Sequence, residues 1–185
     1  MNTPYNPKEH KQLPSFGLLA LGISLLTYIF YKADMFESSA FYIGCLLLIS
    51  GSIQIMVGMR SQKQGHPYAA GTLLPLGMFW LSIIGLEVFP KLGYGESPSA
   101  MVTVSYLSLW ALFVALLFLR SFRQSISMRY LYGTMMVCLM LLSLDQMRDD
   151  QVFLLLGCVF GLCSALVAMY AAIHNVLINR GLCSS

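Results

Sequence analysis

The sequence predicts an all-α membrane protein with six transmembrane helices, and three observations support this fold class. The 185-residue chain is 57% hydrophobic and only 10% charged, whereas about a quarter of the residues of a soluble domain are charged. A soluble fold of this size could not bury so much apolar surface. Apolar runs fill the chain from Ser15 to Ile178, and they lack the period-two alternation of membrane barrel strands. Lipid is therefore the expected solvent.

Six apolar spans account for most of the chain. Each approaches or exceeds the roughly 20 helical residues that cross a hydrocarbon layer of about 30 Å. The fifth is short, so we expect it to extend to Met147 or to begin earlier. The spans form one transmembrane domain, residues 15–179, between a polar segment, 1–14, and a short tail, 180–185. In order, the predicted spans are 15–31, 40–59, 69–89, 100–119, 130–144 and 152–178.

The loops between the spans have the composition of turns, and their charges indicate an orientation. SQKQGHPY (61–68) is polar, and PKLGYGESPS (90–99) is rich in glycine and proline. Of the 11 lysines and arginines, all but three lie on the side of the N-terminus, the loops after the second and fourth spans, and the tail. The positive-inside rule then predicts that both termini are cytoplasmic. The three on the other side are Lys32, Lys91 and Arg148.

Signatures of enzymes, metal sites and nucleic-acid binding are missing from the sequence. There is no H-E-x-x-H, G-x-S-x-G, Walker or dinucleotide-binding motif, so we predict no enzyme and no cofactor. The three histidines lie at or beyond span ends, and no pair of carboxylates falls deep within a span, so we predict no metal site. The net charge of +3 is not arranged as a basic stripe with aromatics, so no nucleic-acid partner is expected.

The third span contains residues that are unusual in a membrane helix. Its sequence, LLPLGMFWLSIIGLEVFPKLG, covers residues 73–93. Pro75 removes a backbone hydrogen bond, and Gly77 and Gly85 let another helix or a solute approach. Glu87 lies near the outer boundary, where we expect it to reach water. Such irregularities in a membrane helix are tolerated where the helix faces protein or a cavity. We therefore predict that this helix lines a narrow conduit, with a notch at Pro75, which lacks a backbone hydrogen bond, and Gly77, which lacks a side chain.

Neutral polar residues are the remaining candidates inside the membrane. Burying Gln54, in the second span, costs free energy unless its amide finds partners. Two interpretations stay open: an interhelical hydrogen bond, or a donor lining a path for a small polar or weakly anionic solute. Thr72, in the third span, is a further candidate lining residue. In the sixth span, small residues share one helical face and favour close helix packing: Gly157, Gly161, Ala165 and Ala168.

Five segments from the second to the fourth span form a recognisable series in order and spacing: GSIQIMVG (51–58), KQG (63–65), GMFWLSII (77–84), FPKLG (89–93) and SYLSLWALF (105–113). In these segments the chain resembles the acetate/succinate uptake transporter family, small six-helix proteins of bacteria and fungi. The family's N-terminal Asn-Pro-x-Pro-Leu-Gly motif is broken here, because Asn6-Pro7 is separated from LPSFGLL, where Gly17 and Leu18 keep only its end.

The resemblance implies a homo-oligomer, a hexamer of six-helix protomers, each with its own path through the lipid bilayer. Family members carry small monocarboxylates and, in some cases, succinate, together with protons. Gln54, Trp80, Tyr106 and Trp110 match family positions, and we predict that the first three line the path with Thr72. The family's narrow point is a ring of bulky apolar side chains, commonly Phe, Tyr and Leu. At the matching positions this chain has Leu21, Leu76 and Met135.

The predicted function is a channel or proton-linked transporter for small carboxylates such as acetate or succinate, in the cell (inner) membrane. The alternative is a non-transporting membrane scaffold or stress protein that retains the fold. The ring stays apolar, so a gate that closes by dewetting survives, but loss of the family's phenolic hydroxyl puts acetate itself in doubt as the substrate. A lining that contains Gln54 and is closed only by apolar rings favours transport, whereas a scaffold is expected to pack that route solid.

Overall fold

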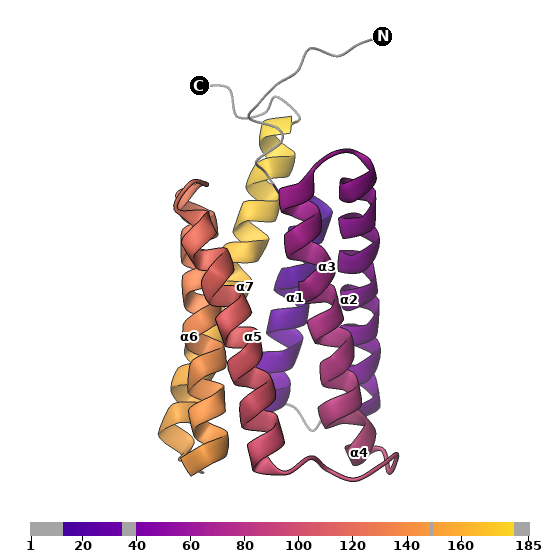
Figure 1. Cartoon of the computed structure of the whole chain (residues 1–185), viewed down its shortest axis with the longest axis vertical. Coiled ribbons are helices and arrows are strands. Elements are labelled where there is room, and N and C mark those ends of the chain that lie inside the picture. The colour runs from indigo at the N-terminus through magenta and orange to yellow at the C-terminus, as the bar shows by residue number, and fades with distance from the viewer. Residues whose placement is uncertain (1–12, 35–39, 149, 180–185) are drawn as a thin grey trace.

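The computed structural model describes residues 13–34, 40–148 and 150–179, and the regular structure within these ranges is helical throughout. Six helical spans run along the long axis of the molecule (Figure 1). Each is long and apolar enough to cross a membrane, so the predicted fold class is confirmed. Most of the predicted N-terminal segment (residues 1–12) and the tail (180–185) lie outside the described residues.

The helices follow the predicted order, and several extend beyond the predicted spans. The fifth span does so at both ends, because charged and amphipathic side chains near a membrane surface can keep their polar groups in water while the backbone stays helical. The bounds are α1 Ser15–Lys32, α2 Ala40–Lys63, α3 Pro67–Ile83, η2 Ile84–Val88, α4 Phe89–Lys91, α5 Ala100–Ser121, α6 Ile126–Arg148 and α7 Gln151–Asn179.

The third span is one continuous rod made of α3, the π-helical turn η2 and the short α4. The π turn is seen in the hydrogen bond that the Phe89 N–H donates to the Ile84 carbonyl, five residues earlier. Pro90 explains the widening, because it has no N–H to offer the Leu86 carbonyl and its ring crowds that carbonyl in a regular α-helix. π turns of this kind recur at functional sites, and this one contains Glu87.

The six spans form a ring whose backbones pack in the order α3, α2, α1, α7, α6, α5. Figure 1 shows α2 and α3 on one side of the molecule and α5 and α6 on the other. The ring closes between α3 and α5 through aromatic side chains: the Phe79 ring stacks on Tyr106 at 5.9 Å between centroids and lies 5.0 Å from Trp110. Side chains from α1, α3, α5 and α6 therefore meet in the interior.

The outside of the ring is apolar, as expected for a protein in lipid. Many large hydrophobic side chains are exposed along the spans, and this exposure would be unfavourable in water. In a bilayer they contact acyl chains instead. Examples from three helices, α2, α5 and α7, are Leu48, Ile49, Leu109, Leu112, Leu116, Leu155 and Leu166.

Helices α2 and α3 approach closely where two glycines face each other. A Cβ added to Gly77 would lie 2.8 Å from the Gly51 carbonyl oxygen and 2.7 Å from a side-chain carbon of Ile55. A Cβ at Gly51 would in turn lie 3.1 Å from the Gly77 carbonyl oxygen. The neighbour that approaches the predicted notch at Gly77 is therefore helix α2.

We expect Gly77→Ala to destabilise the protein by about 1–3 kcal/mol, because the new methyl group collides with backbone atoms that cannot rotate away. The matched control is Gly71→Ala on the same helix, where an added Cβ meets nothing within 4 Å. Alanine there should be neutral or slightly stabilising, since it restricts the unfolded chain. The measurement is the unfolding midpoint in mixed detergent micelles. Equal midpoints for the two variants would contradict the tight contact.

The small residues of the sixth span pack inside the protomer. An added Cβ at Gly157 would meet the Leu142 side chain at 3.1 Å, and one at Gly161 would meet the Cys138 sulfur at 2.9 Å. The Ala165 carbonyl oxygen would lie 3.2 Å from a Cβ at Gly22 on α1. The predicted close helix packing is thus present between α7, α1 and α6, and this face is not available to a neighbouring protomer.

Candidate functional site

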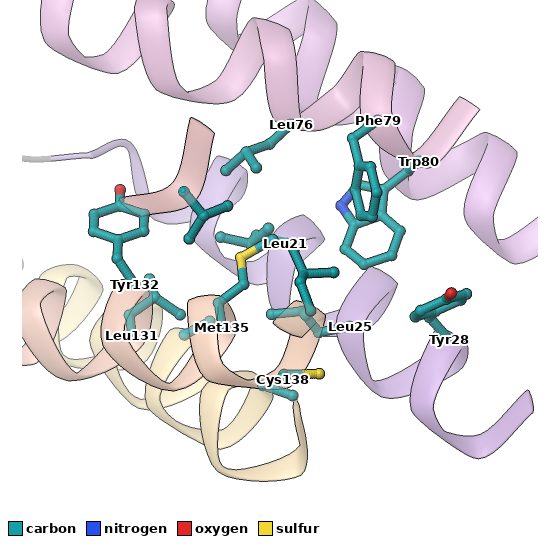
Figure 2. Packing of buried hydrophobic residues seen from close by; sticks show 14 of the residues in the cluster. Leu21, Leu25, Tyr28, Leu76, Phe79, Trp80, Leu131, Tyr132, Met135 and Cys138 are labelled. Carbon is teal, nitrogen blue, oxygen red and sulfur yellow. The ribbon is translucent and has the colours of Figure 1, made fainter. Parts of the chain in front are cut away.

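The three residues predicted to form the constriction lie together in the interior of the ring. Leu21, Leu76 and Met135 come from α1, α3 and α6, and each side chain has 0% of its surface accessible. All three belong to one cluster of buried side chains, and Figure 2 shows them pointing toward one another. The structure therefore has a point where apolar side chains from three helices close the interior. A charged solute could not pass it with its hydration shell intact.

Two polar groups near this apolar cluster make no hydrogen bond with the described residues. They are the indole Nε1 of Trp80 on α3 and the hydroxyl of Tyr132 on α6, and both side chains are fully buried. The Tyr132 hydroxyl lies near those of Tyr68 and Thr72 without a well-formed hydrogen bond to Tyr68. Figure 2 places Trp80 and Tyr132 on opposite sides of the Leu21–Leu76–Met135 cluster. Buried polar groups are normally paired, so these two are candidates for contact with a solute.

Gln54 lies in the interface between α2 and α1, where its two amide atoms differ. Nε2 donates to the Ser24 hydroxyl at 2.9 Å, and that hydroxyl lies 2.7 Å from the Ser50 hydroxyl. Oε1 is buried without a partner among the described residues. One half of the amide thus makes the interhelical hydrogen bond, while the other half keeps an acceptor free. Both interpretations of Gln54 stay open, and its role in a path remains a prediction.

We expect Gln54→Leu to lower carboxylate uptake several-fold, because the change removes the free acceptor as well as the donor to Ser24. Stability should change by about 1 kcal/mol or less, since the Ser24 hydroxyl keeps another partner. Ser50→Ala is the matched control, because it weakens the same network and leaves the amide in place. Uptake into proteoliposomes and the unfolding midpoint are measured for both. Equal losses of uptake would assign the effect to the network rather than to the amide.

The other predicted lining residues lie at different places in the ring. The Tyr106 hydroxyl donates to the Phe79 carbonyl at 3.1 Å and contacts the Ser82 hydroxyl, so it links α5 to α3. The buried Thr72 hydroxyl donates to the Tyr68 carbonyl one turn earlier, at 2.9 Å. Trp80 packs edge-on against Tyr28 and tilted against Phe79. Of the predicted set, Trp80 belongs to the same cluster of buried side chains as Leu21, Leu76 and Met135, and Figure 2 shows it beside them.

Pro75 is half-buried in the middle of α3, one residue before Leu76. Because a proline cannot donate to the carbonyl four residues earlier, the turn before Leu76 has one backbone hydrogen bond fewer. Gly85 lies about three turns after Pro75, and nothing is within 4 Å of a Cβ added there. Of the two glycines expected to admit a neighbour, Gly77 is covered by α2 and Gly85 is open.

The sequence prediction missed an ion pair at the end of α1. Glu87 was expected to reach water, and its side chain is 9% accessible and lines an open cavity; its Oε2 also lies 2.9 Å from the Lys32 Nζ. The Tyr28 hydroxyl donates to Oε1 at 3.0 Å. A signal was present in the sequence, since Lys32 and Glu87 carry opposite charges and lie near span ends that the order of the spans puts on the same side. That signal could be used only with the knowledge that the first and third spans are neighbours in space.

The fold and the closed apolar point define a class: a multi-pass membrane protein, with six spans around an interior that buried side chains close. A family model matches residues 1–181. The chain belongs to the GPR1/FUN34/yaaH family, and the predicted family resemblance is confirmed.

Relatives and a solved structure agree with this assignment. The chain is 22% identical over 161 residues to the succinate-acetate/proton symporter SatP of Escherichia coli, with 87% of this chain and 86% of that protein covered. It is also 22% identical over 168 residues to an uncharacterized protein of Methanothermobacter thermautotrophicus, with 87% and 82% covered. The structure of the bacterial acetate channel SatP superimposes with a TM-score of 0.83 at 22% identity, covering 90% of this chain and 92% of that one.

Proposed function

We propose that this protein is a membrane channel or proton-linked transporter for small carboxylates such as acetate or succinate, with one path in each protomer. Membership of the family and similarity to a protein named as a succinate-acetate/proton symporter support the solute class. The proposal makes the protein a transporter rather than an enzyme, in the inner membrane if its source is a bacterium. Membership of the family and the similarity to a named symporter favour transport over the non-transporting scaffold.

The observation that carries the proposal is the apolar closure at Leu21, Leu76 and Met135, with unpaired buried polar groups beside it. A small carboxylic acid has the matching character. Its methyl or methylene groups tolerate an apolar ring, and its carboxyl group can accept a hydrogen bond from Trp80 Nε1 and exchange one with the Tyr132 hydroxyl. The neutral acid avoids the large cost of an unpaired charge in such a place.

The test is uptake of labelled acetate and succinate into proteoliposomes, with and without an inward proton gradient. Empty liposomes of the same lipid supply the control, because neutral acids also cross lipid unaided. We expect protein-dependent uptake that saturates with solute and increases with the gradient. Uptake no faster than in empty liposomes, from protein whose fold is intact by circular dichroism, would refute the proposed function.

Orientation and assembly are part of the same proposal. Cytoplasmic termini follow from the lysine and arginine asymmetry, and a reporter fused after Ser185 that is active only outside the cytoplasm would contradict them. A homo-hexamer is proposed from the family resemblance and from the exposed apolar faces of the spans. Native mass spectrometry in mild detergent measures the assembly, and a monomer alone would count against it.

A further inference from the structure

One end of the ring carries only positive charges within the part of the chain that the structure describes. It is the end where α2 and α5 finish and where α3 and α6 begin. Figure 1 shows the α2–α3 and α5–α6 turns there, with α4 at the opposite end. The charged side chains at this end are Arg60, Lys63, Arg120, Arg123 and Arg129.

The carboxylates within the described ranges lie at the opposite end. Between Glu96 and Asp145 the sequence contains no aspartate or glutamate, so α5 and almost all of α6 carry no negative side chain. Arg123 and Arg129 therefore have no counter-ion on their own helices. The acidic residues at the opposite end follow α1, lie in η2 and the loop before α5, and flank the α6–α7 turn: Asp34, Glu87, Glu96, Asp145 and Asp150.

Three further acidic residues, Glu9, Glu37 and Asp149, lie outside the described residues. Of these, only Glu9 belongs to the segment before α1, and Lys8 and Lys11 accompany it in the sequence. That segment therefore has more positive than negative side chains. The anion that balances the arginines of the α5–α6 turn is expected from outside the chain.

Arg129 is held in place at this turn. Its guanidinium carbon lies 4.6 Å from the centre of the Phe122 ring, and its Nη2 donates to the Phe122 carbonyl at 3.4 Å. Its Nε is buried without an acceptor among the described residues. Because α6 begins at Ile126, the positive end of its dipole lies at the same turn. Arg120 differs, since it stacks on the ring of the buried Tyr68 at 5.0 Å.

An apolar stripe on the outer surface of α5 leads to Arg123. Leu112, Leu116 and Leu119 are 62%, 59% and 64% exposed, and their spacing puts them on one face of the helix. Arg123 comes four residues after Leu119, which continues the spacing. Its N–H still donates to the carbonyl three residues earlier, at 3.3 Å, so the chain keeps turning up to this residue. A guanidinium group thus stands at the end of a lipid-facing row of leucines.

This arrangement fits an anionic phospholipid better than a soluble anion. In a bilayer, the ends of the spans lie at the level of the phosphate groups, and the acyl chains run along the spans. Arg123 and Arg129 are at such an end, and arginine suits phosphate through its several N–H donors. A soluble anion would use the arginines alone and would leave the stripe uncovered.

We propose that the α5–α6 turn binds an anionic phospholipid, with its phosphate at Arg123 and Arg129 and an acyl chain along Leu119, Leu116 and Leu112. With the proposed orientation, this lipid belongs to the cytoplasmic leaflet, whose anionic lipids attract basic residues near the membrane surface. The binding site itself does not depend on which solute the protein carries.

The experiment is native mass spectrometry of the full-length protein, freed of lipid in mild detergent and then titrated with phosphatidylglycerol. Phosphatidylcholine with the same acyl chains is the control, because it has the phosphate but no net charge. We expect phosphatidylglycerol to bind on the order of tenfold more tightly, since each basic residue near a charged lipid surface contributes a several-fold gain. Equal binding of the two lipids would overturn the proposal.

Single substitutions locate the site. Arg123→Gln and Arg129→Gln should each weaken phosphatidylglycerol binding about fivefold and leave phosphatidylcholine binding unchanged. Arg148→Gln is the matched control, because Arg148 is also on α6 and also stacks on a phenylalanine, Phe153, at 5.9 Å, but lies at the end with the carboxylates. Circular dichroism confirms that each variant is folded. An unchanged affinity in either variant at the turn, or an equal loss in Arg148→Gln, would overturn the proposal.

Two further measurements separate a lipid from other occupants. Leu116→Gln should weaken phosphatidylglycerol binding several-fold although no charge changes, and inorganic phosphate at the same concentration should not displace the lipid. Displacement by inorganic phosphate would make the turn a site for small anions instead. If Arg123→Gln changes the number of protomers in the same spectra and not the number of bound lipids, this face is an interface between copies of the chain. Either result would overturn the proposal.

Discussion

Initial uptake of acetate into proteoliposomes should rise about tenfold for each unit by which the external pH is lowered between 7.5 and 5.5, at constant total acetate. The reason is the closure at Leu21, Leu76 and Met135, where all three side chains are fully buried. Moving an unpaired carboxylate through this closure would cost a large amount of free energy. Small carboxylic acids have pKa values near those of Asp and Glu, about 4–5, so under about 1% is neutral at pH 7.

Uptake by empty liposomes is subtracted at each pH, since their permeability to the neutral acid has the same pH dependence. Acetamide supplies a second control, because its charge does not change in this range. A protein-dependent rate that stays constant with pH would contradict the prediction. It would mean that the apolar ring opens enough to admit the hydrated anion.

Leu76→Ala should raise the uptake of acetate, lactate and succinate roughly three- to tenfold, with the largest increase for the bulkier solutes. Removing three carbon atoms from one side of the closure leaves space where the solute must pass. The same truncation should destabilise the protein by about 2–5 kcal/mol, as is usual for a buried leucine. Initial rates for the three solutes and the unfolding midpoint are both measured.

Leu47→Ala is the matched control for Leu76→Ala. Leu47 is equally inaccessible but lies on α2, outside the three residues of the closure. We expect a similar loss of stability with little change in uptake. If Leu76→Ala leaves all three solutes unchanged, Leu76 is not at the constriction, and the position inferred from the family resemblance is wrong.

The fold could be predicted from the sequence because lipid imposes a simple requirement. Every backbone group in a bilayer must be paired internally, so long apolar runs become helices. The ends of α6 were harder to predict. Residues such as Tyr130, Gln146 and Met147 suit both a helix near the membrane surface and a loop. The predicted core 130–144 was expected to extend to Met147 or to begin earlier, and the helix does both, running from Ile126 to Arg148.

The candidate site could be predicted only in part, since helical periodicity gives the faces of a span but not its neighbours. Leu21, Leu76 and Met135 were found through resemblance, and the structure places them in one cluster. The pairing of Lys32 with Glu87 depends on α1 lying next to η2, which nothing in the local sequence states. For Gln54, the sequence showed a buried amide but not that only one of its two atoms is paired.

The junction between α3 and α5 makes the protomer resemble a split ring. At the other five junctions of the ring, the backbones of neighbouring helices pack directly against each other. At this junction the closure consists of Phe79, Tyr106 and Trp110, together with the hydroxyl contact between Tyr106 and Ser82. Aromatic side chains change position by rotation about two torsions, whereas a packed helix must move as a rigid body. The interior of the protomer can therefore widen along this line without the loss of a hydrogen bond between two backbone groups.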